Sequence, residues 1–252
     1  GGGGSCGATV VLPAGTSVLT AAIEIYDSVE LRGQGQFNTG LLVGAGFPGT
    51  SDVIFLCDPA VQLACFGAKV SNLSITSPAS VSASSSTYLI SSVSVQQATA
   101  IEHVAAYSLA ERGCFRYTNG YGGAAKVDIE DFFCTISSAN ASDGIVINPT
   151  TTVNIIFRGG LIVEAGGGGY AGNAVNWQSG NLFIESLHVE GIVTGLFAQV
   201  SVGTYQGSLH ASTGGNGCTE LVKLHTTNTP SNLIVGTSQV NGCTRLITNG
   251  QP

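Results

Sequence analysis

The chain has 252 residues, of which 43% are hydrophobic and only 9% are charged, and its formal net charge is −7. Disordered chains are usually rich in charge and poor in apolar residues, so this composition predicts a folded protein. With eight Lys and Arg in total, there is no basic cluster of the kind that binds a phosphate backbone. No apolar run approaches the roughly twenty residues that span a bilayer. We therefore expect neither a nucleic-acid partner nor a membrane partner.

The first predicted strands lie within residues 7–36, "GATVVLPAGTSVLTAAIEIYDSVELRGQGQ". Pro13 to Gly15 form a turn between two of them, at a position where proline is tolerated. This stretch resembles the pectate-lyase-like superfamily of right-handed β-helices, and within it the branch that includes bacteriophage tailspikes and secreted polysaccharide-degrading enzymes. The matching residues are Val10, Leu12, Pro13, Ala14, Gly15, Val29, Leu31, Gly33 and Gly35.

The resemblance implies a right-handed parallel β-helix that works on a polysaccharide, and the spikes of this family are trimers. Family members usually carry an N-terminal helix that caps the coil, whereas "GGGGSCG" precedes the motif here and no Met stands at position 1. We therefore expect a processed chain or a fragment, whose open strand edge is covered by an upstream segment or a partner chain. The sequence motifs of polygalacturonases and the Arg-rich calcium site of pectate lyases are absent. The resemblance therefore supports the fold better than any one chemistry.

Two interleaved series of short segments recur along the rest of the chain. "NLSI", "NLFI" and "NLIV" begin at Asn72, Asn181 and Asn232, and "GIVTGLF", "GCTELVK" and "GCTRLIT" begin at Gly191, Gly217 and Gly242. Each repeat therefore holds at least two strands and is too short for a propeller blade. The sequence predicts an all-β, single-stranded right-handed parallel β-helix, with rungs of about 25–28 residues and residues 1–252 in one domain.

Equivalent residues of neighbouring rungs should stack in such a coil. Glu220 and Arg245 would then lie opposite one another, where opposite charges on paired strands are favourable. The same alignment stacks Asn216 on Asn241 and Cys218 on Cys243.

The seven cysteines form no Cys-x-x-Cys pair, which argues against a zinc knuckle. We interpret them mainly as buried free thiols, with a disulfide framework as the alternative. The Ser-rich segment 76–87 and the Gly-rich segment 164–172 are interpreted as surface loops that leave the coil.

Carboxylates supply the candidate catalytic residues. Asp128 and Glu130 are two apart on a predicted strand and so share one face. Aligning "KVDIED" with "NLFIES" places Glu185 in one column with Glu130, two rungs apart at roughly 9–10 Å, the upper edge of the range for inverting glycosidases. Arg158, from the intervening rung, is predicted to bind an acidic sugar. The alternative is that these carboxylates are ordinary solvated surface.

The remaining site candidates come from the same part of the chain. Phe183 should point outward beside Glu185, and Trp177 is a second aromatic that could stack on a sugar. His188 is predicted to bind substrate. With Glu190 it could form a base–orienter pair, but an ordinary surface pair is the favoured interpretation. His103 is not assigned to a site, because the preceding Glu102 should point to the opposite face of the strand. We expect no metal site and no cofactor.

Three functions fit these features. The first is a virion tailspike that attaches to its host by binding, or binding and depolymerising, a surface polysaccharide, as a homotrimer or within a larger viral or extracellular assembly. The second is a secreted polysaccharide lyase or glycoside hydrolase, for which the triplets Asn72-Leu-Ser74 and Asn140-Ala-Ser142 are possible glycosylation sites. The third is a purely structural appendage protein. The expected location is the virion or the extracellular space.

Overall fold

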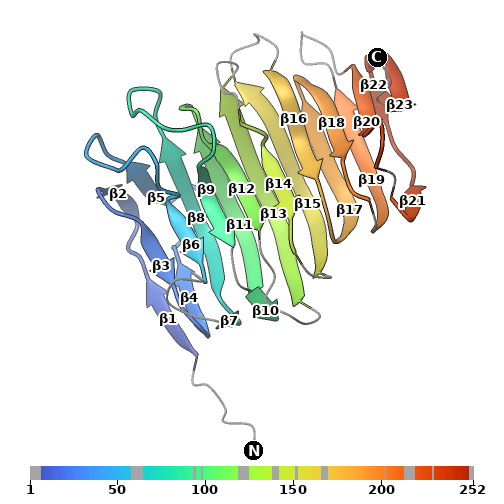
Figure 1. The fold of residues 1–252 in the computed structure, drawn as a ribbon. Coiled ribbons are helices and arrows are strands. Elements are labelled where there is room, and N and C mark those ends of the chain that lie inside the picture. The colour runs from blue at the N-terminus through green and yellow to red at the C-terminus, as the bar shows by residue number, and fades with distance from the viewer. Residues whose placement is uncertain are drawn as a thin grey trace, which may run out of the picture.

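The computed structural model describes residues 7–57, 65–92, 95–97, 99–118, 125–137, 142–150, 153–165, 170–201, 203–212, 219–228 and 230–249. Within these ranges the regular elements are all strands, and their pairings are parallel. Figure 1 shows them stacked from β1, in blue, to β23, in red. The prediction of an all-β parallel solenoid is confirmed. The described part of the chain holds no helix that could cross a membrane.

Two long parallel sheets form the walls of the solenoid. The first, with 12 strands, contains β1 (Ala8–Val11), β2 (Gly15–Leu19), β4 (Val29–Arg32), β5 (Thr39–Val43), β8 (Lys69–Ser77), β11 (Thr99–Ser108), β13 (Ala125–Ser137), β15 (Val153–Ala165), β17 (Asn181–Glu190), β19 (Thr204–Ser212), β21 (Asn232–Val235) and β22 (Val240–Asn241). The second, with nine, contains β3 (Ile23–Ile25), β6 (Ile54–Leu56), β9 (Tyr88–Ser92), β12 (Gly113–Thr118), β14 (Ile145–Asn148), β16 (Tyr170–Trp177), β18 (Ile192–Ala198), β20 (Glu220–Leu224) and β23 (Arg245–Asn249). A small third sheet pairs β7 (Cys65–Phe66) with β10 (Val95–Gln97).

The register gives the length of a rung directly. Val127 pairs with Ile155, and Ile155 pairs with Leu182, which are offsets of 28 and 27 residues. These agree with the predicted 25–28. Nearer the N-terminus the rung length varies more, because Ala8 pairs with Val29, an offset of 21 residues, and Glu30 pairs with Lys69, an offset of 39.

The long strands of the first sheet bend partway along their length. Asn72, His103 and Asp131 have φ of 56°, 52° and 47°, and Gly159 has φ of 78°. These four residues occupy equivalent positions in β8, β11, β13 and β15, because Glu102 pairs with both Ser71 and Glu130, and Glu130 pairs with Arg158. Asn, Asp and His adopt this left-handed conformation more readily than most residues, and Gly does so without a steric cost.

The bend changes which residues face outward. In β13, Val127 and Ile129 are buried before the bend, and Phe132 and Cys134 are buried after it. The two residues at the bend, Glu130 and Asp131, therefore both lie on the outside. The strict alternation used in the sequence analysis fails at this point, and for the same reason Glu102 and His103 are both on the outer surface, contrary to our prediction.

The C-terminal repeat stacks as predicted where it is described. Glu220 pairs with Arg245 in register, and Glu220 Oε1 lies 3.9 Å from Arg245 Nη1. Asn216 and Cys218 lie outside the described residues, so their predicted stacking stays a prediction.

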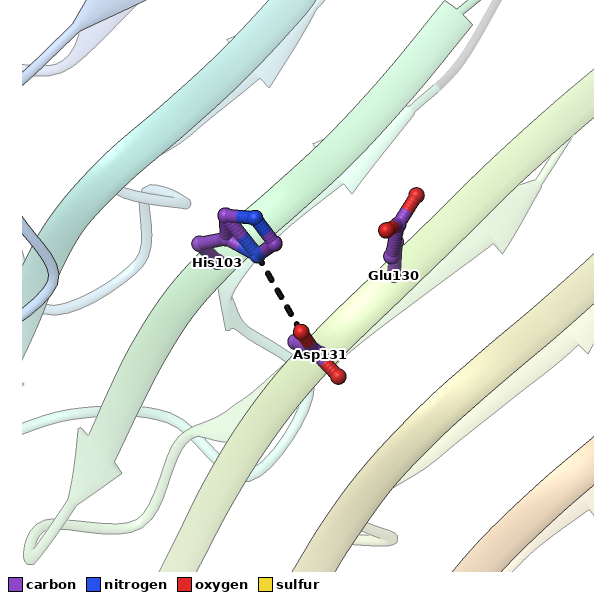
Figure 2. A group of neighbouring side chains, drawn as sticks. All are labelled: His103, Glu130 and Asp131. Carbon is purple, nitrogen blue, oxygen red and sulfur yellow. Dashed lines mark ion pairs between the residues drawn. The ribbon is translucent and has the colours of Figure 1, made fainter.

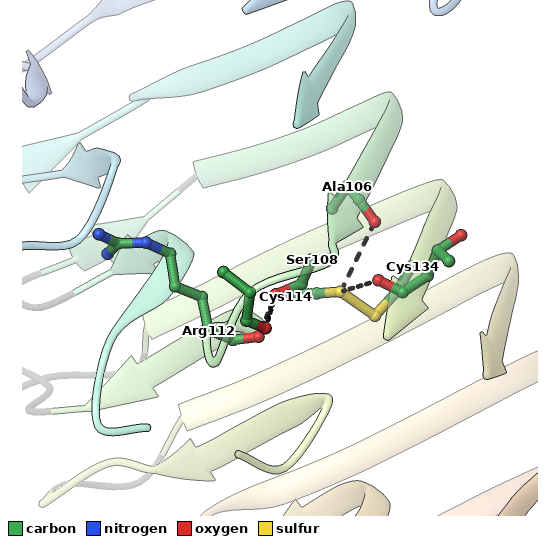
Figure 3. The surroundings of a disulfide bond; sticks show 7 residues. Ala106, Ser108, Arg112, Cys114 and Cys134 are labelled. Carbon is green, nitrogen blue, oxygen red and sulfur yellow. Dashed lines mark hydrogen bonds between the residues drawn. A yellow bond between two sulfur atoms is a disulfide. The ribbon is translucent and has the colours of Figure 1, made fainter. Parts of the chain in front are cut away.

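The prediction of free thiols is wrong for Cys57, Cys114, Cys134 and Cys243. Cys114, on β12, and Cys134, on β13, form a disulfide in the core, and Cys57 and Cys243 are also disulfide-bonded. Figure 3 shows the Cys114–Cys134 bond next to the Ala106 carbonyl. Sequence spacing did not reveal it, because Cys114 and Cys134 are 20 residues apart but meet across the interior of the coil.

The two predicted loops are shorter than expected. β8 runs through Ser77, and the chain is then without strands until β9 begins at Tyr88. In the second segment, β15 ends at Ala165 and β16 begins at Tyr170, and residues 166–169 lie outside the described part of the chain.

Candidate binding groove and charged face

One face of the solenoid carries a large share of the charged residues. It consists of the outward side chains that precede the bend in the first sheet, and we call it the charged face. Its members are Glu30, Arg32, Lys69, Glu102, Lys126, Asp128, Glu130, Arg158 and Glu185. Parallel stacking brings them together, because each rung adds its outward residues beside those of the previous one.

Ion pairs run along the N-terminal half of this face. Glu30 pairs with Arg32, its Oε1 lies 3.7 Å from Lys69 Nζ, and Lys69 Nζ is in turn 2.5 Å from Glu102 Oε2. The hydrogen bond from Arg32 is the main reason that the pKa of Glu30 is lowered. This half is a self-neutralising ladder, which is an ordinary way to cover a solvated strand surface.

Arg158 is the centre of the C-terminal half. Its Nη1 donates a 2.6 Å hydrogen bond to Asp128 Oδ1, and its Nε lies 3.3 Å from Glu185 Oε1. Lys126 Nζ is 2.7 Å from the other oxygen of Asp128. Arg158 therefore lies beside Glu185, as the rung alignment predicted, and it also contacts Asp128. The guanidinium is already paired with two carboxylates.

These contacts shift the pKa values of Asp128 and Arg158. Partial burial raises the pKa of Asp128, but hydrogen bonds from Lys126 and Arg158, with their positive charges, outweigh it and leave that pKa below its usual value. The same hydrogen bond to Asp128 raises the pKa of Arg158. Asp128 is therefore held as a carboxylate, which is the opposite of what a general acid requires.

The predicted column of Glu130 and Glu185 is only partly formed. The alignment is correct as far as Ile129, Phe157 and Ile184, which pair in register. Beyond this point the register shifts, and Ser186 pairs with Arg158. Glu185 thus sits on an irregularity that the sequence did not indicate.

A groove of about 450 Å³ lies beside Arg158 at the C-terminal end of the charged face. Its lining includes Ile156, Phe183, Gln206 and Ile234, which form one column of outward residues on four successive rungs. Arg158, Glu185 and Ser208 also line it. The predicted outward position of Phe183 beside Glu185 is confirmed, and the volume is within the range of ligand pockets.

The predicted substrate-binding role of Trp177 is wrong. Its side chain has no exposed surface, its Nε1 donates a 3.1 Å hydrogen bond to the Gly180 carbonyl, and its ring packs against Tyr205. It fills the interior of the coil, where a sugar cannot reach it. The sequence could not reveal this, because a single aromatic residue does not show which face of its strand it occupies.

His188 lies away from the groove, after the register shift in β17. It pairs in register with His210 of β19, and both line a small hollow with Asn241. Its Nε2 is 4.0 Å from Glu190 Oε2, so the predicted neighbours are close but their contact is long. Its predicted role in binding substrate stays a prediction.

A further group of side chains was missed by the sequence analysis. His103, Glu130 and Asp131 each present a ligand atom, and these atoms all lie within 4.8 Å of one another (Figure 2). His103 Nδ1 is 3.3 Å from Asp131 Oδ2. The bend brings them together, and no spacing in the sequence signals its position.

Similarity of the chain to known proteins is found among solved structures. No family model and no curated protein sequence matches it. Among solved structures, it is similar to the A-module of mannuronan C-5 epimerase AlgE4 from Azotobacter vinelandii, with 12% identity, coverage of 98% of this chain and 90% of that chain, and a TM-score of 0.35. It is also similar to the A-module of AlgE6 from the same organism, with 12% identity, coverage of 98% and 89%, and a TM-score of 0.32. Both TM-scores are below 0.5, so neither similarity assigns a substrate or a reaction.

Proposed function

We propose that the chain binds a neutral, hydroxyl-rich polysaccharide in the groove beside Arg158. The observation that carries this proposal is the column of Ile156, Phe183, Gln206 and Ile234, flanked by the charged groups of Arg158 and Glu185. A sugar ring presents an apolar face of C–H groups and a rim of hydroxyls. The column offers an aromatic and two aliphatic surfaces for the ring face, and the flanking groups accept and donate hydrogen bonds at the rim.

The repeat of the solenoid suits an extended chain rather than a single sugar. Successive rungs place equivalent side chains about 4.8 Å apart, so the groove continues along the stack over several strands. A polymer lying across the strands would meet an outward residue from each rung. This geometry favours a polysaccharide over a small, globular ligand.

Charge favours a neutral glycan over the acidic sugar that the sequence analysis predicted. Asp128 and Glu185 already pair with Arg158, and Glu130 faces Arg158 across the strands. An incoming carboxylate would have to displace one of these partners and approach a chain with a net charge of −7. Hydroxyl groups meet no such repulsion and can donate to the free lone pairs of the carboxylates.

The groove supports binding better than cleavage. A glycosidase needs a carboxyl group that remains protonated until it donates to the leaving oxygen. Asp128 is held as a carboxylate by Lys126 and Arg158, and Glu185 is paired with the same guanidinium. The catalytic roles predicted for Glu130 and Glu185 stay predictions, as does the alternative of a secreted lyase or hydrolase.

The proposal is tested by affinity electrophoresis of the full chain through gels that contain neutral or uronate-containing polysaccharides. Phe183→Ala should weaken binding to the neutral polymer about tenfold or more, since it removes most of one buried aromatic contact. Phe66→Ala is the matched control, because Phe66 is an exposed aromatic on β7, outside the groove. Equal loss in both variants would place the binding site elsewhere, and stronger retention by uronate polymers would overturn the preference for neutral glycans. Release of reducing ends during incubation would favour the enzymatic alternative.

Attachment to a host as part of a virion spike is a further proposal. The assembly that such a spike requires is supported by the first rung, where Val10, Val11 and Val18 are 50%, 57% and 62% exposed. β1 and β2 form the edge of the first sheet in the described part of the chain, and exposed apolar edge strands tend to pair with other strands. This favours assembly with another chain segment, and the trimer expected from the family resemblance is one such assembly.

A further inference from the structure

We propose that His103, Glu130 and Asp131 form a binding site for a divalent first-row transition metal such as Zn²⁺ or Mn²⁺. The ligand atoms of these three side chains lie within 4.8 Å of one another on the outer surface of the first sheet (Figure 2). His103 comes from β11, and Glu130 and Asp131 come from the neighbouring β13. The inference does not depend on the proposed binding of a polysaccharide.

The backbone brings the three side chains onto the same side of the sheet. His103 and Asp131 occupy the same position of the bend in adjacent rungs, with φ of 52° and 47°. His103 and Asp131 therefore both point outward, as do Glu102 and Glu130 directly before them. In the next rung the equivalent position is Gly159, which has no side chain to cover the site; a Cβ there would lie 2.8 Å from Asp131 Oδ1. The carboxylate of Asp131 thus remains open to an ion.

The charge balance of the face is an independent reason to expect a cation here. Glu30, Glu102, Asp128 and Glu185 each have a Lys or Arg within ion-pair distance. Among the described residues no Lys or Arg lies within ion-pair distance of Glu130 or Asp131, and the side chain that contacts both is the imidazole of His103. Glu130 also lies directly opposite Glu102 in register, where like charges are unfavourable. A bound divalent cation would neutralise the negative charges of Glu130 and Asp131.

The donor set selects the class of metal. Two carboxylates alone would suit Ca²⁺ or Mg²⁺, which take oxygen ligands. An imidazole nitrogen beside them favours Zn²⁺, Mn²⁺ and other first-row ions. Donor separations near 3 Å are needed around an ion with bonds of about 2.0–2.2 Å, so the exposed side chains must close by small rotations. The 3.3 Å between His103 Nδ1 and Asp131 Oδ2 is already suitable.

Three protein ligands on an exposed surface leave positions in the coordination sphere for water or another oxygen ligand. Glu130 pairs in register with Arg158, which lines the groove. The ion would therefore sit on the rung next to the groove. In the metal-free chain, His103 Nδ1 and Asp131 Oδ2 make an ordinary surface contact at 3.3 Å.

The test is calorimetric titration of the full chain, stripped with a chelator and desalted, with Zn²⁺, Mn²⁺ and Ca²⁺ in turn. His103→Asn removes the imidazole while keeping a residue type that already adopts the same conformation at Asn72. Asp131→Asn and Glu130→Gln remove one carboxylate each. Each of the three variants should weaken Zn²⁺ binding by at least about tenfold, because even residues that only support metal ligands change affinity by that factor.

Glu102→Gln is the matched control, because it removes a neighbouring carboxylate of the same face that is already paired with Lys69. It should leave the affinity within about twofold, well inside the tenfold limit. The proposal is overturned if the parent chain binds neither Zn²⁺ nor Mn²⁺, or if His103→Asn and Asp131→Asn bind Zn²⁺ as the parent does. Ca²⁺ binding that equals Zn²⁺ binding would overturn the assignment to a transition metal. Circular dichroism melting of each variant checks that the fold is retained, since these substitutions leave the core unchanged.

Discussion

Replacing Gly33 by alanine should destabilise the solenoid strongly, although the substitution adds a single methyl group. Gly33 belongs to the first-rung motif and follows β4 directly, at a point where the chain packs against β8. A Cβ at this position would lie 2.1 Å from the Asn72 carbonyl oxygen and 2.8 Å from Thr39 Cβ. Ordinary contacts need at least 3.4 Å, so the two segments would have to separate by about 1 Å or more.

The cost follows from the bonds that this separation would break. The Gly33 amide donates a 2.9 Å hydrogen bond to the Ser71 carbonyl, and the Gly35 amide donates a 3.0 Å hydrogen bond to the Asn72 carbonyl. Each is worth about 0.5–1.5 kcal/mol, and overpacking typically costs a further 1–3 kcal/mol. We expect Gly33→Ala to lower the free energy of unfolding by about 3 kcal/mol, and Tm by roughly 6–12 °C for a chain of this size.

The measurement is urea unfolding followed by circular dichroism, with Gly46→Ala as the matched control. A Cβ at Gly46 would have no atom within 4 Å, and its φ is not in the left-handed region. That variant should be neutral, or more stable by up to about 1 kcal/mol, because alanine reduces the entropy of the unfolded chain. Equal midpoints for the two variants would refute the close approach of Gly33 to β8.

Three further predictions concern the disulfide, the charged face and the open edge. The double variant Cys114→Ala/Cys134→Ala should lose about 3 kcal/mol in urea unfolding, because the bond closes a loop with a sequence separation of 20; an unchanged midpoint would contradict this. The folded-state pKa of Asp128 is lowered, so its ion pairs stabilise the chain above its ordinary pKa and are lost as the pH falls through the lowered value. Asp128→Asn should therefore flatten the decline in stability below about pH 4, and it should cost roughly 1 kcal/mol or less at pH 7. A variant whose stability falls with acid as the parent's does would count against the ion pairs of Asp128. Light scattering at micromolar concentration should show self-association through the exposed valines of β1 and β2, most simply a trimer, whereas a stable 25.5 kDa monomer would exclude it for the isolated chain.

The sequence by itself determined that the chain forms a stack of parallel strands and which residues of neighbouring rungs lie side by side. Alternation fixed the inner and outer faces of β17, so that Leu182 is buried and Phe183 lies outside. The repeat interval placed Glu220 beside Arg245, and the rung alignment placed Arg158 near Glu185. These features depend on period-two strands and on a near-constant offset between rungs, and both are visible as patterns of residue type.

Tertiary structure alone decided the features that break this regularity. The left-handed bend puts His103 on the same side as its neighbour Glu102, and the register shift after Ile184 moves Glu185 off the predicted column. The closed coil encloses a space that has to be filled. Trp177 is buried in it, and Cys114 meets Cys134 across it. The sign of φ at a non-glycine residue and the volume left inside a closed coil depend on contacts between rungs, and no local pattern of residues records them.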